Sequence, residues 1–160
     1  MRCVELRAVL YDEDATAALD RIGAWERYPE LAPHVNATEV HAAPPAEVCS
    51  SSWELHFRSG LLSWSEEEEF LPEQLIIRFA QTHGDFESFS GRWELRRTGD
   101  DVEVLFRADF DFGIPSMEGI LDPIAERVLK ESVAWALTGL FPRAEILGET
   151  DLIPARGDAV

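Results

Sequence analysis

Hydrophobic and polar residues alternate along most of the first two thirds of the chain, which is the pattern of β-strands with one buried face. The first such stretch covers residues 2–11, and six more follow before residue 112. Their expected ranges are 35–42, 46–57, 62–70, 74–82, 86–97 and 101–112. The breaks between them are short and rich in Pro, Gly, Ser and Asp, so they allow only hairpins. The pattern predicts an antiparallel meander that curls to cover its apolar face.

Two regions interrupt the strand pattern with helical signals. Asp12 and Asp14 can cap a short helix through Ile22, and a further turn can follow before Pro29. These signals predict two short helices between the first strand and the second.

A longer helical pattern runs from about residue 117 to residue 140, with apolar residues every three or four positions. Pro123 lies in the first turn if the helix begins near Asp122, and kinks the helix if it begins earlier. A straight helix does not fit closely against a curled sheet, so we expect a ligand cavity between the two.

Three segments accompany this order of elements: YPELAP at residues 28–33, GRWEL at residues 91–95 and FRADFDF at residues 106–112. Together they resemble the START-like helix-grip superfamily (SRPBCC), in particular its polyketide cyclase/aromatase and coenzyme Q-binding branch. The resemblance implies an α+β helix-grip fold of the START/Bet v 1 type, with a seven-stranded curled antiparallel sheet around the long C-terminal helix. We expect a ligand-binding domain over residues 1–141 and a loose tail over residues 142–160.

The resemblance also implies a hydrophobic tunnel without a dedicated cofactor. Such tunnels hold either a polyketide tethered to an acyl carrier protein or a free lipid or quinone. In aromatase/cyclases of this type, two cavity arginines on the fourth and fifth strands orient the polyketide. Counting from Trp64, the matching positions hold Glu68 and Gln81, and this departure counts against the arginine mechanism.

Aromatic and aliphatic side chains on the apolar faces are the candidate ligand contacts. They are Tyr28, Trp53, Trp64, Phe89, Trp93, Phe106, Ala108, Phe110, Ile124, Val128 and Trp135. Each of them could equally be a core residue, but together they suit a planar, largely apolar ligand. We expect a cavity of roughly 300 Å³ or more, the lower limit for a drug-sized ligand.

The four glutamates at 66–69 contain the candidate catalytic residues. Alternation places Glu66 and Glu68 on the apolar face. Burial would raise their pKa values toward the range of general acids and bases, so we expect Glu68, with Glu66 beside it, to drive cyclisation and dehydration. Gln81 would hold a substrate carbonyl. Two alternatives stay open: a solvated edge with a bulge, and a salt bridge to Arg78 or Arg58.

Composition narrows the classes of partner. The chain has 14 Lys and Arg against 31 Asp and Glu, a net charge of −17, which disfavours nucleic acid and anionic membranes. Acyl carrier proteins are also acidic, so a tethered substrate would need a local basic patch, which Arg92, Arg96 and Arg97 could supply. An acidic surface that docks a basic partner is a third, weaker hypothesis.

Other sequence signals are absent. No secretory signal and no membrane-length apolar run is visible, so we expect a cytoplasmic protein without membrane insertion. Cys3 and Cys49 should be reduced, buried thiols, and the four histidines lack metal-ligand spacing, so no metal site is expected. The preferred hypothesis is a polyketide cyclase/dehydratase-like enzyme, and the alternative is a non-catalytic lipid or quinone carrier.

Overall fold

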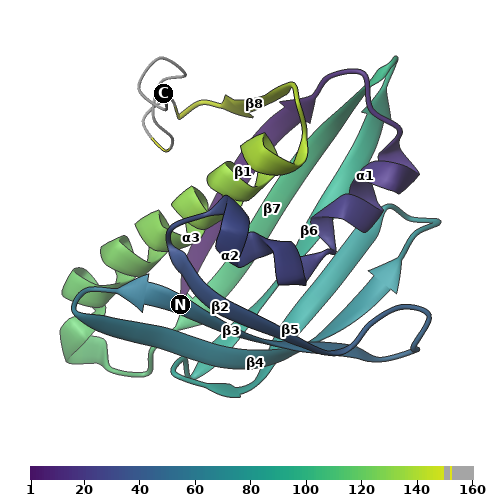
Figure 1. Ribbon diagram of the computed structural model, residues 1–160. Helices are drawn as coiled ribbons and strands as arrows, with labels where there is room; N and C mark the ends of the chain where they lie inside the picture. The colour runs from purple at the N-terminus through teal and green to yellow at the C-terminus, as the bar shows by residue number, and fades with distance from the viewer. Residues whose placement is uncertain (150–151, 153–160) are drawn as a thin grey trace.

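The computed structural model describes residues 1–149 and Leu152, and the strands in this part of the chain form one curled antiparallel sheet (Figure 1). The strands are β1 (Arg2–Leu10), β2 (Val35–Ala42), β3 (Cys49–Phe57), β4 (Gly60–Leu71), β5 (Ile76–Gly84), β6 (Ser88–Thr98), β7 (Asp101–Asp111) and β8 (Ala144–Leu147). Their order in the sheet is β2-β3-β4-β5-β6-β7-β1-β8. The predicted hairpin meander from β2 to β7 is confirmed, and β1 closes onto β7.

The helices lie on the concave side of this sheet (Figure 1). They are α1 (Ala15–Ile22), the 3₁₀ turn η1 (Trp25–Arg27), α2 (Tyr28–Leu31), the 3₁₀ turn η2 (Pro115–Met117) and α3 (Glu118–Leu140). The Asp14 side chain accepts a hydrogen bond from the Ala17 N–H and caps α1 as expected. The start of α3 at Glu118 leaves Pro123 inside the helix, the second of the two alternatives.

Period-2 alternation fixes which side chains enter the core. Along β7, every second residue from Val102 to Phe110 is buried, and the residues between them are partly exposed. The same alternation places Cys3 beside Glu5 and Arg7 on the outer face of β1. Cys3 is therefore exposed, contrary to expectation, whereas Cys49 is buried, and both are free thiols.

An eighth strand replaces the first part of the expected loose tail. Residues Ala144–Leu147 pair antiparallel with Arg7–Leu10 of β1, and Ala144 and Ile146 pack against the core. Without β8, one edge of β1 would carry unpaired backbone groups, so the pairing satisfies them. Residues 150–151 and 153–160, for which a loose tail was also expected, lie outside the described residues.

Gly91 allows β6 to approach its neighbours closely. A Cβ at this position would collide with the Arg107 carbonyl oxygen of β7 and would lie 2.6 Å from Cζ of Phe79. We therefore expect Gly91→Ala to lower the free energy of unfolding by about 1–3 kcal/mol, the usual cost of overpacking. Urea denaturation measures this loss.

The matched control is Gly119→Ala near the start of α3, where an added Cβ meets nothing within 4 Å. Alanine is the better helix former there, so this variant should be as stable as the parent or slightly more stable. Equal stability of Gly91→Ala and the parent would contradict the close approach of β6 and β7.

Candidate functional site

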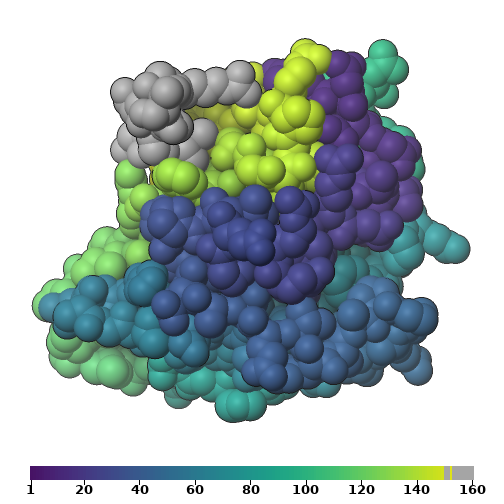
Figure 2. All heavy atoms as spheres, in the orientation of Figure 1, coloured from purple at the N-terminus to yellow at the C-terminus, as the bar shows by residue number. Residues whose placement is uncertain are grey.

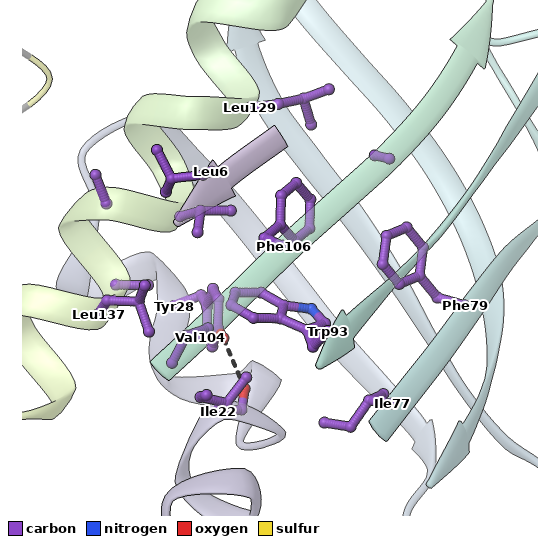
Figure 3. Packing of buried hydrophobic residues seen from close by; sticks show 14 of the residues in the cluster. Leu6, Ile22, Tyr28, Ile77, Phe79, Trp93, Val104, Phe106, Leu129 and Leu137 are labelled. Carbon is purple, nitrogen blue, oxygen red and sulfur yellow. Dashed lines mark hydrogen bonds between the residues drawn. The ribbon is translucent and has the colours of Figure 1, made fainter. Parts of the chain in front are cut away.

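A cavity lies between the concave face of the sheet and α3, and its volume is about 50 Å³. Figure 3 shows Trp93, Phe106 and Phe79 projecting from their strands toward this space, with Leu129 of α3 opposite. The lining residues are Trp25, Tyr28, Trp53, Leu55, Trp64, Glu66, Phe79, Phe89, Trp93, Phe106, Leu129, Ser132 and Val133. The polar groups of this largely apolar lining are the carboxyl of Glu66, the hydroxyls of Tyr28 and Ser132, and the indole N–H groups of the four tryptophans.

The cavity is much smaller than the expected roughly 300 Å³, because the aromatic rings fill the space themselves. Trp53 and Trp64 stack with their ring centroids 6.0 Å apart, and Trp93 meets Phe106 edge to face at 4.9 Å. The atoms of the α1 to β2 region form a continuous layer across one face of the molecule (Figure 2). A ligand larger than a few water molecules therefore requires these rings to separate.

Most polar groups of the cavity wall already have partners. The Tyr28 hydroxyl donates to the Ile22 carbonyl oxygen at 2.6 Å, the dashed line in Figure 3. The Trp64 indole N–H donates to Glu66 Oε1 at 2.7 Å, and the Trp53 N–H donates to the Ser51 hydroxyl at 2.9 Å. These bonds hold the rings in place and leave their faces to contact a ligand.

Glu66 and Glu68 form a buried carboxyl pair on the inner face of β4. Their exposed fractions are 5% and 3%, and the Ser51 hydroxyl donates to Glu68 Oε2. Burial, followed by the charge of the neighbouring Glu68, raises the pKa of Glu66 well above its usual value, although the bond from Trp64 opposes this shift. The other oxygen of Glu68, Oε1, is buried without a partner in the described part of the chain.

Strand register explains how two carboxyls come to lie inside. Trp53 faces Trp64 across β3 and β4, Ser51 faces Glu66, and both pairs point inward. The irregularity in the β4–β5 pairing between Ser65 and Glu66 does not turn Glu66 outward, so the solvated-edge alternative is wrong.

The salt-bridge alternative fails as well. Arg78 lies on the outer face of β5 and contacts Glu69 at 3.4 Å. Within the described part of the chain, neither Glu66 nor Glu68 has a cation at ion-pair distance. The pair is therefore held by hydrogen bonds from neutral groups, from the Trp64 indole to Glu66 and from the Ser51 hydroxyl to Glu68.

The structure brings together seven of the predicted site residues at the cavity. They are Tyr28, Trp53, Trp64, Glu66, Phe89, Trp93 and Phe106. Glu68 lies behind Glu66 and does not line the cavity. Gln81 also stays outside the lining, where its amide N–H donates to the Phe86 carbonyl oxygen at 3.0 Å.

The remaining five predicted contacts do not line the cavity. Ala108 and Phe110 are fully buried in the core, and Ile124, Val128 and Trp135 are only partly buried. Trp135 meets the His34 ring edge to face at 6.0 Å instead. The buried stripe of α3 is rotated relative to the expected one: it contains Ala125, Leu129, Ser132 and Val133, whereas Ile124, Val128 and Trp135 are only partly buried.

Six lining residues were not predicted: Trp25, Leu55, Phe79, Leu129, Ser132 and Val133. Alternation with Ile77 could have indicated Phe79, since both side chains share one face of β5. Trp25 lies in a three-residue 3₁₀ turn, where no periodic signal identifies the inward side.

Two of the three arginines of the expected basic patch on β6 are paired with neighbouring acids. Arg92 lies 3.2 Å from Glu94, and Arg96 forms an ion pair with Glu103. Arg97 donates instead to the Thr16 hydroxyl at 3.2 Å, so the patch offers an acidic carrier protein the uncompensated charge of Arg97 only.

The architecture defines a START/Bet v 1-like helix-grip protein: a long C-terminal helix held in a curled antiparallel sheet. The structure is similar to TTHA0849 from Thermus thermophilus, with 24% identity, a TM-score of 0.75, and coverage of 87% of this chain and 94% of that one. It is also similar to the Zhui aromatase/cyclase from Streptomyces sp. R1128, with 13% identity, a TM-score of 0.71 and coverage of 87% and 90%. A START superfamily protein from Mycobacterium smegmatis has 16% identity, a TM-score of 0.71 and coverage of 88% and 97%.

The chain belongs to the family described as polyketide cyclase / dehydrase and lipid transport, whose family model matches residues 16–136. The resemblance drawn from the sequence is thereby confirmed, and so is the helix-grip fold, with eight strands instead of seven. The search of curated proteins finds no significant match. In the described residues, no helix is long and apolar enough to span a membrane.

Proposed function

We propose that the protein binds a planar, largely apolar molecule of the polyketide type in this cavity and promotes its cyclisation or dehydration. Residues 1–141 form the ligand-binding domain in this proposal, and Glu66 is the acid and base. The observation that carries the proposal is a buried carboxyl, in surroundings that favour its neutral form, on the wall of an aromatic cavity. The family description and the fold of the Zhui aromatase/cyclase support it.

The chemistry follows from the proton on Glu66. In the dehydration step, Glu66 gives its proton to the departing hydroxyl group, which leaves as water. The carboxylate formed then takes a proton from the adjacent carbon as the double bond forms, and Glu66 is neutral again. The buried carboxylates of Glu66 and Glu68 would repel each other, so the return of a proton to Glu66 is favourable. Glu68 thus positions and holds the proton, and Glu66 transfers it.

A second candidate function is supported by the missing arginines. The positions that carry them in aromatase/cyclases hold Glu68 and Gln81, and the cavity wall is almost entirely apolar. A carrier of a lipid or quinone needs no proton transfer and would tolerate this wall. In that case, the carboxyl pair would only fix the local packing.

A short synthetic β-polyketone thioester distinguishes the two functions. If the protein is an enzyme, mass spectrometry should detect products that have lost one water per ring closed, formed faster than in buffer alone. Recovery of the thioester unchanged from the protein, at the rate of cyclisation in buffer, would favour the carrier.

A further inference from the structure

Among the described residues, the indole N–H of Trp25 is the cavity-lining donor that is fully buried and has no hydrogen-bond partner. Trp25 lines the cavity and is 3% exposed. Its Nε1 is buried and makes no hydrogen bond in the described part of the chain. The indole N–H groups of Trp53 and Trp64 are both paired. Buried donors in proteins are nearly always paired, so a lone one calls for an explanation.

Trp25 contacts several rings of the aromatic cluster. Its ring centroid lies 5.5 Å from that of Tyr28, 5.7 Å from that of Trp53 and 6.5 Å from that of Trp93. These three rings line the cavity too, so a molecule that separates them also meets the Trp25 indole.

The turn that carries Trp25 is the shortest element of the cavity wall. The turn η1 has three residues and lies between α1 and α2 on the concave side (Figure 1). The Thr38 hydroxyl donates to the Trp25 carbonyl oxygen at 2.9 Å, which anchors the backbone and leaves the indole N–H free. Apart from Tyr28, the other aromatic residues of the cavity lie on strands that are hydrogen-bonded to a neighbouring strand on each side. The indole of Trp25 can therefore adjust to a ligand at lower cost than the strand residues.

We propose that the natural ligand carries a ring carbonyl oxygen that accepts a hydrogen bond from Trp25 Nε1, so that Trp25 selects the ligand. This inference rests on the proposed function, because it requires the cavity to be the ligand site. An indole N–H can only donate, so its partner must be an acceptor. In an aromatic cavity, that requirement selects a cyclic ketone or quinone over a hydrocarbon of the same shape. Sequence patterns did not indicate this residue.

A matched pair of small ligands tests the proposal. 1-Tetralone and tetralin have the same fused rings and differ in one ketone. Titration calorimetry should show tetralone binding about tenfold more tightly than tetralin to the parent protein, since one hydrogen bond contributes up to about that factor. In Trp25→Phe the preference should fall to about one, with tetralin affinity within about twofold of the parent. Trp135→Phe, which changes a tryptophan outside the cavity lining, should keep the parent's preference.

The outcomes separate this inference from the proposed function. Equal affinities for tetralone and tetralin in the parent would overturn the inference alone, because the cavity would still bind ligands. No binding of either would overturn the ligand site and the inference with it.

A measurement on the parent protein decides the matter even if Trp25→Phe does not fold. The ionisable groups that line the cavity with Trp25 are the Glu66 carboxyl and the Tyr28 hydroxyl, whereas an indole N–H does not ionise in this pH range. The tetralone preference should therefore stay constant between about pH 6 and 9. A preference that falls as pH rises would assign the donor to the Glu66 carboxyl and overturn the role of Trp25.

Discussion

Replacement of Glu66 by Gln should slow dehydration of a bound polyketide by about 10²–10⁴-fold, the usual contribution of a general acid–base group. Gln has the shape of Glu, and its amide oxygen can still accept the 2.7 Å bond from the Trp64 indole. The cavity and its ligand affinity should therefore persist, whereas proton transfer is lost. Single-turnover mass spectrometry with the β-polyketone thioester measures the rate.

The control for this variant is Glu67→Gln. Glu67 is the next residue on β4, but it is exposed on the opposite face, so the loss of its charge should leave the rate unchanged. If Glu66→Gln, folded and with normal affinity, dehydrated the thioester at the parent rate, Glu66 would have no catalytic role. The lipid or quinone carrier would then be the better account.

The stability of the protein should fall as pH rises, by about 1.4 kcal/mol per pH unit for the contribution of Glu66. Burial and Glu68 raise the pKa of its carboxyl in the folded state, whereas in the unfolded chain the carboxyl ionises near its usual value of about 4.3. The folded state thus binds one proton more than the unfolded state in this window. The stabilisation is complete below about pH 4.3 and is lost as pH approaches the raised pKa of the folded state.

Chemical denaturation of the parent and of Glu66→Gln between about pH 5 and 8 isolates this contribution, because the other titrating groups are common to both proteins. The difference in unfolding free energy should move in favour of the Gln variant as pH rises. Glu67→Gln should run parallel to the parent. Parallel curves for Glu66→Gln and the parent would mean that Glu66 is ionised in the folded protein.

Much of the fold could be predicted because period-2 alternation and turn residues act locally. The strand that contains Glu66 and Glu68 shows this clearly: alternation from Trp64 placed both carboxyls inside, and both are buried. The expectation of a loose tail was wrong for the residues of β8, because these four residues form a strand only through pairing with the free edge of β1. That pairing depends on contacts far apart in sequence.

The site was harder to predict than the fold. The volume of the cavity depends on how rings such as Trp53, Trp64 and Trp93 pack on each other. A sequence pattern predicts on which face of a strand a ring lies, but not which residues it contacts. The periodicity of α3 left the orientation of its buried face uncertain by about one residue. Trp135 was expected inside, whereas Leu129 and Val133 line the cavity.

The central claim is that burial in an aromatic cavity lets Glu66 keep its proton well above the usual pKa of a glutamate. A carbon-13 NMR titration of protein labelled at the glutamate carboxyls tests it most directly, with Glu66→Gln to assign the Glu66 signal. We expect that signal to titrate well above the usual value of a glutamate carboxyl, because burial and the neighbouring Glu68 favour its neutral form. A Glu66 signal that titrates near the usual value of about 4.3 would contradict the account.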